Sequence, residues 1–191
     1  NELNVTKDSW TGSWHNIIVT YDRTTIKLYV YNVLKDSDTP STPNVQPVSG
    51  SFTIGKAYSN EYFDGKLDDV RIYNTALSSI EIKNIYNQGR PNTGPIAHWS
   101  LDEKRGSLAV DSINNFAATI SGPNLRTTGY DGTINGAMDF DGSNDYLEVK
   151  SKINEIQAMS FWMKPDDTTS RGIIQLSQSK YIKLSDKSTL N

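Results

Sequence analysis

The chain contains the run Phe63-Asp-Gly-Lys-Leu-Asp-Asp-Val-Arg-Ile-Tyr-Asn-Thr-Ala-Leu-Ser-Ser-Ile-Glu-Ile82, which begins with the alternation typical of a β-strand. Successive side chains of a strand point to opposite faces of its sheet. Asp68, Val70 and Ile72 are therefore expected on one face. The other face is expected to carry Asp69, Arg71 and Tyr73. A carboxylate buried beside apolar side chains needs a cation or several hydrogen-bond donors, which makes Asp68 a candidate site residue.

The second part of the run changes to a helical period. Ser78 with Glu81 three positions later forms the capping-box pattern that begins helices. Gly89 and Pro91 are residues that end them. We predict one short helix over residues 78–88, with an apolar stripe made of Leu77, Ile80, Ile82, Ile85 and Tyr86.

This run resembles the closing segment of laminin-G-like jelly-roll domains, in the concanavalin A-like lectin/glucanase superfamily. Its pattern, F-x-G-x-(I/L)-D-D-V-R-I-Y-N-x-A-L-(S/T)-x-x-E-I, is matched at nearly every position. Four later segments resemble the opening part of the same domain: Trp99-Ser-Leu-Asp-Glu, Asp111-Ser-Ile-Asn-Asn, Gly136-Ala-Met-Asp-Phe-Asp-Gly-Ser-Asn-Asp-Tyr-Leu-Glu-Val and Met159-Ser-Phe-Trp-Met-Lys-Pro. The resemblance implies an all-β fold in which two antiparallel sheets form a jelly-roll sandwich with one short helix.

The two segments stand in the reverse of the family order. Residues 1–90 resemble the C-terminal half of a laminin-G-like domain, and residues 96–191 resemble its N-terminal half, with a Pro- and Gly-containing linker at 91–95. Together they amount to one domain. Three arrangements explain this order: a circularly permuted jelly roll, a repeat cut out of frame from a tandem array, or a subunit whose halves complete those of neighbouring copies.

Composition limits the classes of function. The 191 residues carry a net charge of −3, which disfavours a broad nucleic-acid-binding surface, and no apolar run is long enough for membrane insertion. Cysteine is absent, which excludes disulfides, thiol nucleophiles and thiolate metal sites. Because the chain begins with Asn1 rather than Met, we expect it to be a piece of a longer or processed protein.

Calcium is the predicted cofactor. Ca²⁺ takes six to eight oxygen ligands from carboxylates, amides and backbone carbonyls. The loop at 111–115 resembles the family's D-x-S-G-N loop, which often holds a structural ion, and the acidic turn at 139–145 could face it. The alternative is that these residues only form turns. The predicted metal ligands are Asp111, Asn114, Asn115, Asp141, Asp68 and Asp69.

Carbohydrate or an extracellular protein is the predicted ligand. Trp162 should lie on the strand face opposite Met159, Phe161 and Met163. An aromatic platform flanked by polar groups suits the apolar face and hydroxyls of a sugar. The alternative is that these side chains pack beneath loops. The predicted ligand-binding residues are Trp162, Asp69, Arg71 and Tyr73.

No catalytic constellation is evident. Glycosidases need two carboxylates that flank a cleft. The E-x-D-x-x-E motif of catalytic members of the superfamily is absent, and the adjacent Asp102 and Glu103 would point to opposite faces of a strand. We therefore expect a non-catalytic recognition or adhesion module, secreted or at the cell surface. The alternatives are a structural repeat that binds neighbouring copies of itself and an accessory module of a polysaccharide-active enzyme.

Overall fold

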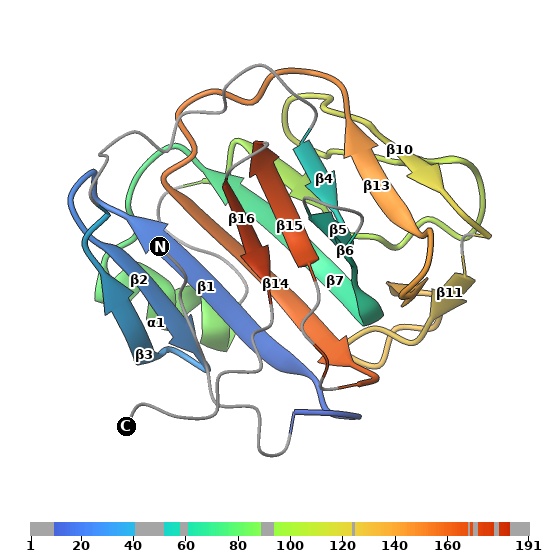
Figure 1. Ribbon diagram of the computed structural model, residues 1–191, viewed down its shortest axis with the longest axis horizontal. Helices are drawn as coiled ribbons and strands as arrows, with labels where there is room; N and C mark the ends of the chain where they lie inside the picture. The colour runs from blue at the N-terminus through green and yellow to red at the C-terminus, as the bar shows by residue number, and fades with distance from the viewer. Residues whose placement is uncertain are drawn as a thin grey trace.

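The computed structural model describes residues 10–40, 52–57, 61–88, 94–123, 125–167, 169, 172–177 and 180–183. These residues form two stacked antiparallel sheets, a separate two-stranded sheet and one short helix. The two stacked sheets make a β-sandwich of jelly-roll type, as predicted (Figure 1). The first half of the described chain contributes β1 His15–Tyr21, β2 Ile26–Val30, β3 Val33–Asp38, β4 Phe52–Ile54, β5 Lys56–Ala57, β6 Glu61–Tyr62, β7 Asp64–Tyr73 and α1 Ser79–Gln88. The second half contributes β8 Ala97–Trp99, β9 Leu108–Ala109, β10 Ala118–Ser121, β11 Leu125–Thr127, β12 Ala137–Asp141, β13 Tyr146–Val149, β14 Ala158–Pro165, β15 Gly172–Ser177 and β16 Lys180–Lys183.

In both stacked sheets a strand of the first half is inserted between strands of the second half. The larger sheet has the order β11-β12-β7-β14-β1-β2-β3, with β8 paired to β7, so β7 lies between two strands of the second half. The smaller sheet has the order β16-β15-β4-β13-β10-β9, so β4 is enclosed in the same way. The halves thus complete one another within a single chain. The linker residues 91–93 and both chain ends lie outside the described residues.

One hydrophobic core joins the two halves. Its central members are at most 4% exposed. The first half supplies Phe52, Ile54, Val70 and Ile72, and the second supplies Met138, Phe140, Leu147 and Val149. Each half alone would expose one side of this core to water, and apolar burial is the main force that stabilises folding.

A β-bulge in β7 changes the predicted arrangement of its side chains. Ser160 of β14 pairs with Arg71 and Trp162 pairs with Asp68, so two residues of β7 lie opposite Phe161. Asp69 has φ of 53°, a left-handed conformation that Asp tolerates better than most residues. Asp68 therefore does not share a face with Val70 and Ile72, because strict alternation ends at the bulge. It lies with Asp69 and Arg71 on the outer face, which is the face of the larger sheet turned away from the core.

Helix α1 covers one end of the outer face. The predicted capping box is confirmed: the Ser78 amide donates to Glu81 Oε2 at 2.9 Å, and the Glu81 amide donates to Ser78 Oγ at 3.4 Å. The predicted apolar stripe needs one correction, since Ile80 is 68% exposed and points away from the sheet. The buried contacts are made by Leu77, Ile82 and Ile85, which pack with side chains of β1, β7 and β14. The predicted stop signals at 89 and 91 lie outside the described residues.

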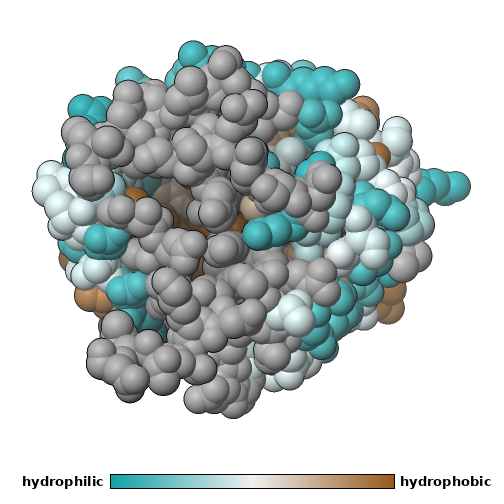
Figure 2. Space-filling view, in the orientation of Figure 1, coloured by the Kyte–Doolittle hydropathy of each residue, from teal (hydrophilic) through white to brown (hydrophobic). Residues whose placement is uncertain are grey.

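The surface seen from the side of Figure 1 is mainly hydrophilic where described residues form it. Figure 2 shows apolar side chains there as small separate spots rather than as one patch. No helix among the described residues has the length and apolar character needed to cross a bilayer.

The interleaved sheets lead to a prediction about fragments. Residues 1–90 and 96–191, expressed separately, should each lack a cooperative unfolding transition, because β7 and β4 lose the partners on both of their edges. Mixing the fragments should restore one transition monitored by circular dichroism. A cooperative transition in either fragment alone would contradict the shared core.

Candidate functional site

The outer face carries a row of three side chains that share one register. Trp162 of β14 pairs with Asn16 of β1 on one side and with Asp68 of β7 on the other. Met159, Phe161 and Met163 are at most 2% exposed in the core, so Trp162 points away from them as the alternation predicted. The row places an aromatic ring between an amide and a carboxyl group.

Trp162 is part of an aromatic stack. The Tyr130 ring lies parallel to it, with the ring centroids 4.2 Å apart and the planes at 6°. Tyr86 of helix α1 approaches Trp162 with a centroid distance of 6.3 Å. One face of the Trp162 ring is thus covered by Tyr130, a residue that the sequence had not indicated.

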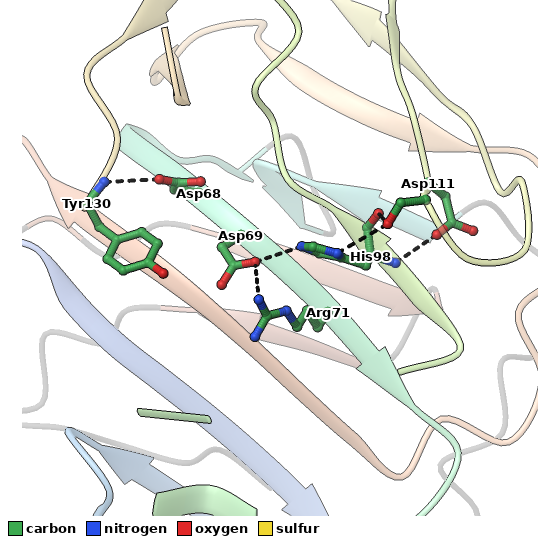
Figure 3. Close-up of polar contacts among 7 residues, drawn as sticks. Asp68, Asp69, Arg71, His98, Asp111 and Tyr130 are labelled. Atoms are coloured by element: carbon green, nitrogen blue, oxygen red, sulfur yellow. Dashed lines mark hydrogen bonds and ion pairs between the residues drawn. The ribbon is translucent and has the colours of Figure 1, made fainter. Parts of the chain in front are cut away.

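A charged cluster adjoins this stack. Asp69 Oδ1 forms an ion pair with Arg71 at 2.9 Å and a hydrogen bond with His98 Nε2 at 2.7 Å (Figure 3). The other ring nitrogen of His98, Nδ1, lies 3.2 Å from Ser112 Oγ. Arg71 of β7 and His98 of β8 are paired in the sheet, so both side chains reach the same carboxylate. That carboxylate belongs to Asp69, which the bulge places on the outer face. The side chains of the cluster are therefore held in place by contacts within the protein.

Asp68 is the most unusual group of the outer face. It is 3% exposed, and the Tyr130 amide donates a hydrogen bond to its Oδ2 at 3.0 Å (Figure 3). Burial raises the pKa of Asp68 to about 8, against the effect of the Tyr130 hydrogen bond. The charges of Asp69, Asp102 and Asp131 raise this pKa further. Asp68 is consequently neutral near pH 7 while Asp69 beside it is paired with a guanidinium.

The structure brings together three of the four predicted ligand-binding residues. Trp162, Asp69 and Arg71 lie on the outer face between the helix and the loop that carries Tyr130. Tyr73 is a correction: it is 0% exposed and packs with Leu77 beneath helix α1, because the helix returns over the end of β7. Sequence reasoning missed Tyr130 and His98. The only available signal for Tyr130 was an aromatic residue within the polar, glycine-rich segment 128–136.

The predicted calcium ligands around Asp111 are already engaged. The Asp111 carboxylate accepts hydrogen bonds from four backbone amides, those of His98, Ile113, Asn114 and Phe116. Burial alone would raise the pKa of Asp111, but these four donors outweigh it and hold the pKa below its ordinary value. The Asn114 side-chain amide donates to the Ile96 carbonyl at 2.9 Å. The Asp111 carboxylate thus stabilises its own loop. These hydrogen bonds compensate for the burial of the carboxylate.

The Asp141 carboxylate likewise accepts hydrogen bonds from its own turn. Asp141 Oδ1 accepts from the amides of Ser143 and Asn144, and these bonds, led by that of Ser143, lower its pKa. Asn115 has φ of 60° and directly follows the turn at residues 112–114. Within the described ranges, no three His, Cys, Asp or Glu side chains gather into a group that could hold a metal ion. The carboxylates of both turns thus accept hydrogen bonds from backbone amides, and the calcium bridge between the turns stays a prediction.

The fold and the outer face define a β-sandwich with a pre-arranged polar and aromatic surface. Residues 1–83 match the family described as the concanavalin A-like lectin/glucanases superfamily. The match covers less than half of the chain, and it includes strand β7 and the first half of helix α1. Comparison of the chain with curated proteins and with solved structures gave no match. The superfamily comprises both lectins and glucanases, so this match by itself assigns no activity.

The Asp111 contacts lead to a prediction about metal. Asp111→Ala should lower the free energy of unfolding by about 2–4 kcal/mol, because four amides lose a charged acceptor. Excess chelator should leave the melting temperature of the wild-type protein unchanged. A fall of the melting temperature with chelator that Ca²⁺ reverses would contradict this account.

The burial of Asp68 leads to a prediction about pH. Because the pKa of Asp68 is higher in the folded than in the unfolded chain, its contribution to stability is greatest below its ordinary pKa and is lost as the pH rises toward 8. Asp68→Asn, which keeps an acceptor but no charge, should raise the free energy of unfolding at pH 8 by roughly 1–3 kcal/mol. Urea unfolding at pH 5 and pH 8 measures this.

The exposed Asp131 provides the matched control for that measurement. Hydrogen bonds from Thr133 hold the pKa of Asp131 below its ordinary value, so Asp131→Asn removes a charge without removing a buried carboxyl. This variant should not gain stability at pH 8 to the same extent. An equal gain in both variants would show that general charge repulsion, rather than burial, governs the effect.

Proposed function

We propose that this protein is a non-catalytic recognition module that binds carbohydrate on the outer face of its larger sheet. The observation that carries the proposal is the aromatic pair Tyr130 and Trp162 beside the fixed cluster of Asp69, Arg71 and His98. We call these five residues the ligand face. Aromatic rings favour the apolar face of a sugar, and hydrogen-bonding groups beside them orient its hydroxyls.

The charges around the ligand face limit the class of sugar. Burial raises the pKa of the Tyr130 phenol, and the carboxyls of Asp69, Asp68 and Asp131 raise it further, with Arg71 opposing them. The single guanidinium of the ligand face is bound to Asp69. Such a field repels anions, so neutral or ammonium-bearing sugars suit this face, and sulfated or uronic-acid polymers do not.

The arrangement of the acidic groups supports a role without catalysis. Hydrolysis of a glycoside needs one carboxyl group as acid and a second as nucleophile or base. Asp69 is held by both Arg71 and His98, and Asp68 is covered by the Tyr130 backbone. Glu103, one of the two adjacent acidic residues singled out in the sequence, accepts from the Val110 amide and lies 3.6 Å from Arg126. Each of these carboxyl groups thus has a structural partner.

The proposal also concerns where the module acts and what it is attached to. A binding face on one side of a stable sandwich suits a secreted or surface protein, or an accessory module that holds a polysaccharide for a neighbouring enzyme. Assembly through exchange of halves receives no support, because the halves already complete one another within the chain.

A glycan array with single-residue variants tests the proposal. Tyr130→Ala and Trp162→Ala should each weaken binding about tenfold or more, since an aromatic contact is worth roughly 0.5–1.5 kcal/mol beyond its buried area. Tyr62→Ala is the matched control. Tyr62 lies near Tyr146 and Lys56, in contacts that do not involve the ligand face.

Two outcomes would overturn the proposal. One is the absence of binding to neutral, amino and acidic glycans alike by the wild-type protein. The other is loss of binding in Tyr62→Ala with full binding in Trp162→Ala. Release of reducing sugar from a bound glycan would contradict the non-catalytic part.

A further inference from the structure

Four aromatic rings that begin on the outer face contact one another in sequence. Tyr130 stacks on Trp162 with the ring centroids 4.2 Å apart, and Trp162 lies 6.3 Å from Tyr86. The ring of Tyr86 in turn lies 6.0 Å from that of Tyr31. All four residues are partly exposed, so no ring of the series is enclosed in the core. We call Tyr130, Trp162, Tyr86 and Tyr31 the aromatic row. It extends the two rings of the ligand face by two more.

The aromatic row runs across the strands of the larger sheet. The Tyr130 amide is bonded to Asp68 of β7, and Trp162 lies on β14, the next strand. Tyr86 belongs to helix α1, which lies behind β1 and β2 in Figure 1, and Tyr31 directly follows β2. Neighbouring strands are about 4.7–4.9 Å apart, so the three spacings from β7 to β2 amount to roughly 14 Å. The row is therefore longer than one sugar ring.

Tyr31 has a backbone conformation that aromatic residues rarely adopt. With Asn32 it forms the two-residue turn between β2 and β3, because Val30 pairs with Val33. Both turn residues have positive φ, 52° for Tyr31 and 58° for Asn32, and this kind of turn favours Asn and Gly. Residues in such conformations persist where the surrounding contacts maintain them, and they gather at functional sites. The turn itself gives no reason for a tyrosine, so the reason lies in its side chain.

Contacts within the protein hold Tyr31 and Tyr86 in place. The Tyr31 hydroxyl donates to the Trp14 carbonyl at 2.8 Å and lies 2.9 Å from His15 Nδ1. Tyr86 follows Ile85, which is 3% exposed and packs beneath the helix. Because both rings are ordered by these contacts, a ligand that touches them does not have to immobilise their side chains. This lowers the entropy cost of binding.

We propose that the aromatic row binds several consecutive units of a linear polysaccharide of neutral sugars, rather than a single terminal sugar. The inference rests on the proposed function, and it adds Tyr86 and Tyr31 to the residues that contact the ligand. One unit lies at Tyr130 and Trp162, where the Asp69 cluster orients its hydroxyls. The following units lie against Tyr86 and Tyr31, where apolar contact supplies the affinity. Because the units are covalently linked, each contact after the first is intramolecular and costs less entropy.

The polar end of the row favours a sugar over a peptide. Aromatic rows also bind proline-rich segments in the extended polyproline conformation. The Asp69 carboxylate beside Trp162 is only an acceptor, and a sugar hydroxyl can donate a hydrogen bond to it. A polyproline segment has no N–H group and cannot do so. The chemistry at this end of the row therefore matches hydroxyl groups.

Calorimetric titration with oligosaccharides of increasing length tests the aromatic row. The probes are glucose, mannose, galactose and N-acetylglucosamine, each as the monosaccharide and as linear β-1,3- and β-1,4-linked oligomers of up to six units. In the series that binds, affinity should rise about tenfold or more from the monosaccharide to the hexamer, as expected for one or two further aromatic contacts. Equal affinity for both overturns the inference, whatever the variants do.

Two substitutions of Tyr86 separate the ring contact from the fold. The measured quantity is the ratio of hexamer affinity to monosaccharide affinity. Tyr86→Leu keeps an apolar side chain but no ring, so this ratio should fall toward one. Tyr86→Phe is the matched control, since it keeps the ring and should keep most of the ratio. A purely structural effect would weaken both ligands alike and leave the ratio unchanged. An unchanged ratio in Tyr86→Leu overturns the inference.

The remaining outcomes distinguish this inference from the proposed function. Binding of terminal or branched glycans on the array, without binding of any linear oligomer, overturns the inference and leaves the carbohydrate proposal standing. The absence of binding to every glycan and every oligomer overturns the carbohydrate proposal and the inference with it. A polyproline peptide that binds more tightly than the hexamers, and loses binding in Tyr86→Leu, overturns the sugar as the occupant of the row.

Discussion

The pairing of β7 with β12 and β14 is the constraint on which the rest of the molecule depends. It places a strand of the first half between two strands of the second, and β4 repeats this arrangement in the opposite sheet. Each of these strands has both edges satisfied only when the whole chain is present. The shared core follows from the same pairing, because its apolar residues come from both halves and face one another across the sandwich.

The same pairing creates the candidate site. The bulge opposite Phe161 puts Asp68 and Asp69 on the outer face, where an unbroken strand would have shown only one of them. Asp69 then reaches Arg71 and His98, whereas Asp68 lies beneath the Tyr130 loop. Two neighbouring carboxyl groups thus have opposite surroundings, one rich in donors and one poor in them. This contrast gives the outer face both a fixed polar cluster and a group whose charge depends on pH.

Local sequence patterns predicted much of the fold. The capping box at Ser78 and Glu81 depends on residues three positions apart, and the direction of Trp162 depends only on alternation along one strand. The bulge could not be predicted, since it depends on how β14 aligns with β7, nor could the stack of Tyr130 on Trp162, which are 32 positions apart in the chain. The calcium ligands stay a prediction for a related reason. An aspartate that binds a metal and one that binds backbone amides look alike in a sequence, and only the loop geometry distinguishes them.

The interleaving of the strands also determines how early during synthesis the chain can fold. Strand β14 follows β7 by about 90 residues, so a ribosome adding roughly 5–20 residues per second needs about 5–20 s to supply the partner. During that interval the nascent chain carries apolar strands with open edges, which are sites for association with other chains. Productive folding must therefore wait for the second half to emerge. We therefore expect residues 1–90 to need protection from association during synthesis more than the strands of a sandwich whose neighbouring strands are made one after another.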